Sequence, residues 1–186
     1  MKQDAAKKAL EALLNDGVCV FPADTVYGLF CRALSPRAAA EIYSIKGRSE
    51  QKPLQLFLSD KVDIYRYALA SPSVKRRVNS LLPGPYTVIL KLRKAYKNSF
   101  SFLKTGTAGF RVVDSGLING IIRELKEPLA ATSANISGGP SPKKFGEIGK
   151  GILSRVSLAV KDDKNVKGTP SKVIDLSGKK EKVIRS

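Results

Sequence analysis

Helical spacing of apolar residues recurs along much of the chain. Apolar side chains at positions 6, 9, 10, 13 and 14 share one face of a predicted helix over residues 5–14, which Asn15-Asp16-Gly17 should end. Serine precedes proline at Ser35 and again at Ser71. Because serine caps a helix and proline suits its first turn, helices are predicted from these points to about residues 46 and 81. Further helices are predicted over residues 62–68, over residues 115–125, and from Pro142 to about residues 149–151.

Short apolar or alternating segments between these helices predict strands. They cover residues 18–21, 54–58, 86–92, 109–113, 129–132, 156–160, 173–176 and 183–184. The segment 83–85, Pro-Gly-Pro, predicts a firm break before the third strand. Residues 93–104 are predicted to form an exposed basic loop, and residues 162–170 a polar loop. Strands that alternate with helices indicate a layered α/β domain with a mixed sheet.

Length and composition bound the architecture and the compartment. The 186 residues, of which 42% are hydrophobic, fit one domain over residues 1–186. No apolar run approaches the roughly 20 residues of a membrane span, and the first residues lack the apolar segment of a signal peptide. A cytoplasmic location with no membrane partner is therefore predicted. In that reducing compartment, Cys19 and Cys31 are expected to be free thiols.

The chain has no histidine, and this excludes several kinds of site. Ser-His-Asp and Cys-His nucleophile systems are excluded, and two cysteines alone do not make an ordinary zinc site. Asp24 and Asp114 follow predicted strands, but neither has a close acidic partner, so no metal site built by the protein is predicted. Mg²⁺ would arrive with a nucleotide, held mostly by phosphates and water. The chemistry must then rest on positioning, cations and hydrogen-bond donors.

The net charge of +17 indicates attraction to anions, either nucleic acid or a nucleotide. Most individual lysines are better explained as part of a solvated surface. Lys46-Gly47-Arg48, with Lys52 shortly afterwards, is a denser cluster. The helix dipole explains a cation at Lys46 alone. It does not explain Arg48, whose planar guanidinium suits phosphate or carboxylate, so the cluster is predicted to bind phosphate.

A second polar segment, residues 133–144, follows the strand at 129–132. Ser133 and Asn135 point to the same side in strand geometry, where a hydroxyl and an amide could face one ligand, although a simple turn explains these residues as well. The loop 138–144 carries lysines at the start of the helix predicted from Pro142, and helix starts bind anions. Neither nucleotide-binding glycine motif, G-x-x-x-x-G-K-[ST] or G-x-G-x-x-G, occurs. Arg111, in an apolar strand, must reach water or meet an anion.

These motifs together resemble the YrdC-like threonylcarbamoyl-AMP synthases. The resemblance spans nearly the whole chain and is carried by residues 21–29 (Phe-Pro-Ala-Asp-Thr-Val-Tyr-Gly-Leu), 46–48, 52–53, 83–85, 111, 133–142, 168–175 and 183–185. It implies the YrdC-like (DHBP synthase-like) fold, a twisted mixed sheet flanked by helices with a positively charged central cavity. It also implies a reaction in which L-threonine, bicarbonate or CO₂, and ATP with Mg²⁺ give threonylcarbamoyl-AMP and pyrophosphate. The product would pass to a tRNA-modifying transfer complex that acts on adenosine 37.

The resemblance also implies roles for individual residues. The residues at threonine-contacting positions are Thr25, Arg111, Ser133 and Ser171. Those at ATP-contacting positions are Arg48, Lys52, Thr107, Asn135, Lys143 and Arg185. Lys46 and Arg48 form the cationic motif expected to stabilise charge at the reacting phosphorus.

The chain departs from the family pattern at Phe57, where some relatives have a threonine-contacting histidine, at Ala23, which replaces a common threonine, and at Val113, which replaces a usual proline. These differences put one threonine contact in doubt and leave open a divergent member with another substrate. A rival hypothesis is a module that binds tRNA or double-stranded RNA through the basic concave surface without catalysis. The net charge favours this rival, whereas the Thr, Ser and Asn residues at strand ends favour the enzyme.

Overall fold

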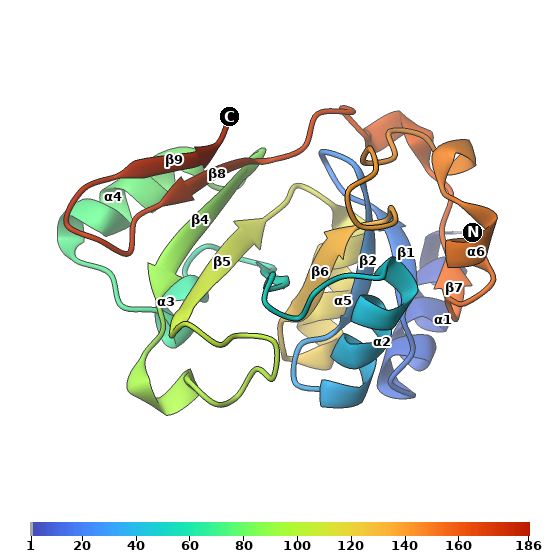
Figure 1. The fold of residues 1–186 in the computed structure, drawn as a ribbon, viewed down its shortest axis with the longest axis horizontal. Helices are drawn as coiled ribbons and strands as arrows, with labels where there is room; N and C mark the ends of the chain where they lie inside the picture. The colour runs from blue at the N-terminus through green and yellow to red at the C-terminus, as the bar shows by residue number, and fades with distance from the viewer. Residues whose placement is uncertain (1) are drawn as a thin grey trace.

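A twisted mixed sheet runs through the computed structural model, which describes residues 2–186 (Figure 1). Within these residues its nine strands follow the order β7-β1-β2-β6-β3-β5-β4-β8-β9. The strands are β1 (Cys19–Pro22), β2 (Tyr27–Arg32), β3 (Gln55–Leu58), β4 (Tyr86–Lys91), β5 (Thr107–Val112), β6 (Leu129–Ser133), β7 (Leu158–Ala159), β8 (Lys172–Asp175) and β9 (Lys182–Arg185). The pairs β1–β7, β3–β5 and β4–β8 are parallel and the other pairs are antiparallel, which confirms a mixed sheet.

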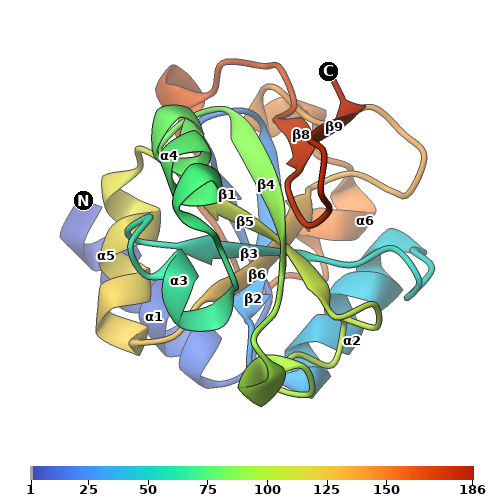
Figure 2. The same ribbon diagram turned by 90° about the vertical axis from the view of Figure 1, so that its left-hand side faces the viewer.

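Helices flank the sheet on both sides, as the alternating pattern predicted. They are α1 (Lys2–Leu14), α2 (Pro36–Lys46), α3 (Ile64–Tyr67), α4 (Pro72–Leu81), α5 (Gly116–Leu125) and α6 (Lys150–Leu153). The two serine caps are confirmed, because Ser35 and Ser71 accept hydrogen bonds from the third residue beyond each of them. Figure 2 shows α1 and α5 on one side of the central strands and α2 on the other.

Alternate residues of the strands pack into two hydrophobic clusters, one on each face of the sheet. On one face, α1 and α5 pack against Cys19, Phe21, Phe30, Phe57 and Leu129. On the other face, α2, α3 and α4 pack against the strand residues that alternate with these. Among them are Val20, Leu29, Cys31 and Leu56. Cys19 and Cys31 therefore belong to different clusters, and both are free thiols, as expected.

Strand β2 was missing from the sequence prediction. It pairs antiparallel with β1 on one side and with β6 on the other, so it is an interior strand of the sheet. Gly28 weakens the sequence signal for a strand. The structure explains the glycine, because a Cβ there would lie 2.6 Å from Cε2 of Phe30. Residues 23–26 form the tip of the β1–β2 hairpin, which positions Asp24 and Thr25.

The predicted helix from Pro142 is wrong. Residues 138–144 form a loop, followed by the short 3-10 turn η2 (Phe145–Glu147) and the four-residue α6. Glycines at positions 146, 149 and 151 disfavour a continuous helix because glycine loses more conformational freedom than other residues. The anion site expected at a helix start beside Lys143 therefore has no helix behind it.

The loop 93–104 is basic, as predicted, but it is not wholly exposed. Phe100, Phe102 and Leu103 are buried, and the ring of Phe100 lies 5.9 Å from that of Tyr67 in α3. The sequence pattern missed this packing because three apolar residues within a lysine-rich segment show no helical or strand period. Among residues 2–186, no helix combines the length and apolar character needed to cross a bilayer.

Candidate active site

A cavity opens on the sheet face that carries Phe30 and Phe57. Its volume is about 120 Å³, and its mouth is open to solvent. The two phenylalanine rings and Ala131 give it an apolar floor. Six residues that the sequence analysis selected line it: Thr25, Arg48, Arg111, Ser133, Ser171 and Arg185. Chain segments far apart in the sequence thus converge on one site.

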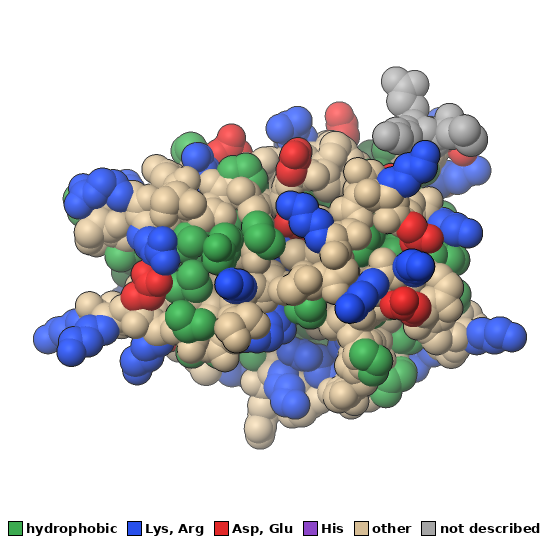
Figure 3. Space-filling model, turned by 90° about the horizontal axis from the view of Figure 1, so that it is seen from above, with side chains coloured by type: hydrophobic (Ala, Val, Ile, Leu, Met, Phe, Trp, Pro, Cys, Tyr) green, Lys and Arg blue, Asp and Glu red, His purple; other side chains and the backbone are tan. Residues whose placement is uncertain are grey.

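Cationic side chains spread over the face of the molecule seen from above, with fewer acidic ones between them (Figure 3). Three arginines, Arg48, Arg111 and Arg185, line the cavity. Asp24 is the nearby acid, and it is paired. The arrangement suits a ligand with more than one negatively charged group.

Arg111, in β5, is the most deeply buried cation of the cavity wall. Its Nη2 donates to Asp24 Oδ1 at 2.5 Å, and its Nη1 donates to Thr25 Oγ1 at 3.0 Å. The guanidinium lies over the Phe57 ring, 5.0 Å from its centroid. Of the two outcomes expected for Arg111, water or an anion, the structure shows an anion, Asp24. Its Nε is fully buried and has no hydrogen-bond partner among residues 2–186.

The hairpin tip that supplies Asp24 and Thr25 is held by later parts of the chain. The backbone N–H groups of Lys167 and Gly168 donate to the carbonyl oxygens of Asp24 and Thr25 at 3.2 and 2.7 Å. Burial raises the pKa of the Asp24 carboxyl, and the neighbouring Arg111 guanidinium opposes that shift. The buried pair is therefore assembled by contacts that no local sequence signal records.

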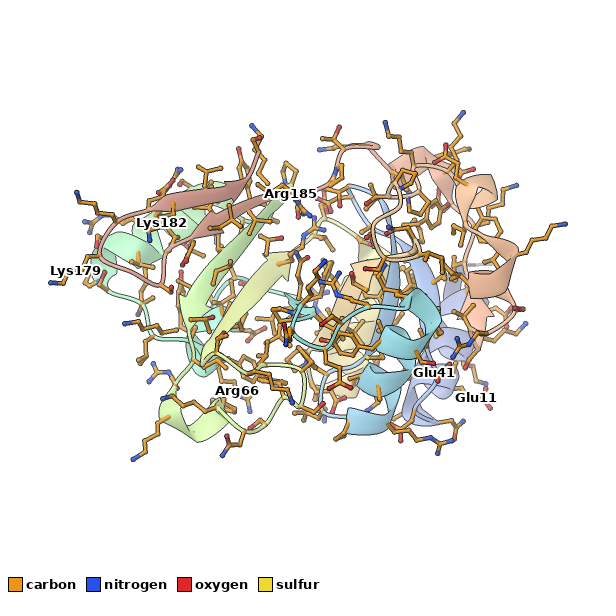
Figure 4. All side chains as sticks on the ribbon, in the orientation of Figure 1. Glu11, Glu41, Arg66, Lys179, Lys182 and Arg185 are labelled. Atoms are coloured by element: carbon orange, nitrogen blue, oxygen red, sulfur yellow. The ribbon has the colours of Figure 1, made fainter. Side chains whose placement is uncertain are left out.

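Arg185 brings a third cation to the cavity from the C-terminal hairpin. Its Nη2 donates to the backbone oxygen of Ser171 at 2.7 Å and to Ser171 Oγ at 3.1 Å. Ser171 Oγ is also 2.9 Å from Thr87 Oγ1, in the buried part of β4. Figure 4 shows Arg185 at the end of β9 near the middle of the molecule, with Lys179 and Lys182 farther out on the same hairpin. Thr87 escaped the sequence analysis, because one threonine in an alternating strand is not a signal.

Arg48 follows α2, whose end is capped by Gly47 in the left-handed conformation with φ 57°. The Nε of Arg48 donates to the Lys52 carbonyl at 3.0 Å, and its Nη2 donates to the Pro53 carbonyl at 3.3 Å. These bonds aim the guanidinium at the cavity, and partial burial lowers its pKa. The predicted phosphate-binding cluster therefore contributes Arg48 to the cavity wall.

Lys46 is buried behind the cavity wall and is not among the lining residues. Its Nζ donates to the backbone oxygens of Ser133 and Asn135 and, at 3.3 Å, to Asn135 Oδ1. Burial lowers the pKa of Lys46 to about 8, and the nearby Arg48 adds to the shift. Lys46 thus contacts the turn that carries Ser133 rather than the open cavity.

The other selected residues lie outside the lining. Asn135 is bonded to Ser133 and Lys46, and Lys52 is exposed in the loop after Arg48. Thr107 begins β5 on the same face as Arg111, four residues away, and bonds to Thr105 at 2.9 Å. Lys143 is exposed, and its aliphatic stem packs beside Gly168.

Gln55 and Ser141 line the cavity, and the sequence analysis missed both. Gln55 is a polar residue at the start of an apolar strand, which is a weak signal by itself. Within residues 2–186, no group of three or more Cys, Asp or Glu side chains is placed to hold a metal ion.

Known proteins resemble this chain over most of its length. The Sua5/YciO/YrdC family model, described as "Telomere recombination", matches residues 11–186. A protein of Methanocaldococcus jannaschii is 35% identical over 185 residues, which cover 97% of this chain and 86% of that protein. A human protein named threonylcarbamoyl-AMP synthase is 31% identical over 157 residues, 84% of this chain and 55% of its own length. The chain thus spans most of the archaeal relative and about half of the human one.

Two solved structures share the fold over the whole chain. Sua5 of P. abyssi in complex with L-threonine superimposes with a TM-score of 0.88 at 25% identity, and the match covers 54% of that protein. YciO of E. coli gives the same TM-score and identity, with 90% of that protein covered. The family model and the archaeal relative each cover nearly all of the chain. The chain belongs to the Sua5/YciO/YrdC family.

Proposed function

We propose that this chain is a threonylcarbamoyl-AMP synthase, which makes threonylcarbamoyl-AMP and pyrophosphate from L-threonine, bicarbonate or CO₂, and ATP. The observation that carries the proposal is the convergence of Arg48, Arg111 and Arg185 on one cavity beside Thr25 and Ser133. A substrate with a carboxylate and a substrate with phosphates both need such cations. The names of the human and P. abyssi relatives support the choice of threonine and of the reaction.

The threonine end of the cavity is assigned to Arg111, with Thr25, Ser133 and Ser171 around it. Arg111 lines the cavity, and a guanidinium can bind the carboxylate of the amino acid. The threonine amine adds to CO₂ and loses a proton, which gives the carbamate. Phe57 offers the substrate a ring face in place of a hydrogen bond.

The nucleotide end is assigned to Arg48, Lys52, Thr107, Lys143 and Arg185. The carbamate oxygen forms a bond to the α-phosphorus of ATP as the bond from that phosphorus to the pyrophosphate oxygen breaks. Arg48, the lining cation of its cluster, is the proposed catalytic residue that stabilises the charge on the phosphoryl oxygens. Holding the reactants together supplies much of the remaining acceleration.

Lys46 and Asn135 take different roles from those that the resemblance implied. Both use their polar atoms on contacts within the chain, so we assign them to positioning Ser133. Mg²⁺ would be held by the phosphates of ATP and by water. We further propose that the enzyme acts in the cytoplasm and that its product passes to a tRNA-modifying transfer complex. The RNA-binding module without catalysis is not favoured, because curated relatives are named as synthases.

Pyrophosphate release with purified protein tests the proposal. Release should require ATP, bicarbonate and L-threonine together, and the Arg48→Ala variant should lose at least about 100-fold in rate, as expected when an electrostatic stabiliser is removed. Arg66→Ala, at an exposed position of α3, is the matched control and should keep normal activity. Pyrophosphate release that does not depend on threonine would contradict the proposed function. Near-normal activity of Arg48→Ala would contradict only the role of Arg48.

A further inference from the structure

The turn that begins at Ser133 is tied to the end of α2 through Lys46. The Lys46 ammonium donates to the backbone oxygens of Ser133 and Asn135 and to Asn135 Oδ1. The Lys46 carbonyl in turn accepts from the Ser137 N–H at 2.9 Å. An ammonium has three donors and no acceptor, so these three contacts use all of its capacity. Because Lys46 is only 1% exposed, this capacity is not shared with water.

Lys46 determines which way the Asn135 amide faces. Because an ammonium can only donate, the oxygen of the amide must lie toward Lys46, and the NH₂ must lie away from it. The NH₂ donates to the carbonyl oxygens of Ile136 and Gly139 at 2.8 and 2.7 Å. The amide is therefore held in one orientation from both ends.

This orientation in turn determines the direction of the Ser133 hydroxyl. Ser133 Oγ donates to Asn135 Oδ1 at 2.5 Å. A hydroxyl has one donor and two acceptor positions, so Ser133 has only acceptors left for the cavity that it lines. If the amide were reversed, its NH₂ would donate to Ser133, and the hydroxyl would be free to donate to a ligand.

We propose that Lys46 is a positioning residue that, through the Asn135 amide, makes Ser133 a hydrogen-bond acceptor, so that this wall of the cavity selects a donor group of the amino-acid substrate. The inference rests on the proposed function and deepens it. The substrate carboxylate cannot bind at Ser133, because two acceptors would face each other, and Arg111 is left to bind it. Threonine offers Ser133 two donors, its side-chain hydroxyl and its N–H.

Calorimetric titration without ATP measures the selection. The probes are L-threonine, L-2-aminobutyrate, which lacks the hydroxyl, and N-methyl-L-threonine, which lacks one N–H. Wild-type protein should bind threonine about tenfold more tightly than one of the two analogues, and which analogue is weak identifies the donor. Ser133→Ala should abolish the preference. Lys46→Met should reduce the preference, because only the carbonyl oxygens of Ile136 and Gly139 then hold the amide in its orientation.

The double variant Lys46→Met/Ser133→Ala should show no loss of preference beyond that of Ser133→Ala, because both changes act on one acceptor. Lys150→Met, at an exposed lysine of α6, is the control for the lysine substitution and should bind all three ligands as wild type does. If Lys46→Met does not fold, Asn135→Leu replaces it, and loss of preference is again expected.

Two results would overturn the inference while leaving the proposed function intact. One is a Lys46→Met variant that binds all three ligands more weakly by the same factor, which is the result expected if Lys46 has a purely structural role. The other is wild-type protein that binds threonine but does not distinguish it from either analogue. Wild-type protein that binds no threonine would instead refute the proposed function, and the inference would be refuted with it.

Discussion

The buried pair between Asp24 and Arg111 gives the sharpest prediction about stability. Their side chains are 9% and 4% exposed, and the N–O distance is 2.5 Å. The substitution Asp24→Asn removes the charge and nearly preserves the shape. Two unit charges about 4 Å apart attract by about 4 kcal/mol at an effective dielectric constant of 20. Removing one member of a buried pair typically costs about 3–5 kcal/mol, because the other charge stays buried.

We therefore expect Asp24→Asn to lower the free energy of unfolding by about 3 kcal/mol, which corresponds to a drop in Tm of roughly 6–12 °C for a chain of this length. Urea titration followed by circular dichroism measures the change. Glu181→Gln is the matched control, since it breaks the Arg77–Glu181 pair, in which both side chains are more than a third exposed. Such pairs contribute only about 0–1 kcal/mol.

If Asp24→Asn costs no more than Glu181→Gln, the charge of Arg111 must be balanced in another way, and the reasoning is refuted. A ligand offers a second check. Because the threonine carboxylate would supply the missing anion, saturating L-threonine should raise the Tm of Asp24→Asn more than that of the wild type. An equal or smaller rise would separate Arg111 from the carboxylate.

Three further predictions follow from other contacts. Because burial lowers the pKa of Lys46 from 10.5 to about 8, the folded state binds fewer protons than the unfolded state between these pH values. The free energy of unfolding of the wild type, relative to that of Lys46→Met, should therefore rise by up to about 3 kcal/mol from near pH 7.5 to near pH 10.5. Urea titrations that show the same difference at both pH values would contradict this. Gly28→Ala would place Cβ 2.6 Å from the Phe30 ring and should lower the free energy of unfolding by about 1–3 kcal/mol. Gly116→Ala, whose Cβ would have nothing within 4 Å, should leave it unchanged. Equal Tm values for the two variants would refute the packing argument. Both cysteines are buried, and burial raises the pKa of Cys19 to about 12. A thiol reagent should therefore modify them only after denaturation. Rapid modification of the native protein would contradict this prediction.

Much of the fold could be predicted from the sequence, because helix caps and apolar periods are local. Ser35 and Ser71 marked helix starts that the structure confirms. The errors arose where tertiary contacts outweigh local preference. Strand β2 tolerates Gly28 because the Phe30 ring occupies the space of a side chain, and the segment after Pro142 stays a loop, held in part by the hydrogen bond from the Tyr27 N–H to the Pro142 carbonyl.

The sequence by itself determined which residue types the site contains. It showed Arg48 after a helix, Arg111 within an apolar strand and Ser133 after a strand. It also excluded histidine chemistry and matched the motifs of a family that the comparisons confirm. Only the tertiary structure decided which of these groups face a ligand and which face each other. Asp24 lies 87 positions before Arg111, and Lys46 lies 87 positions before Ser133. Such partners meet only when the strands pair, because hydrogen bonds and charges act over a few ångströms of space and not along the chain.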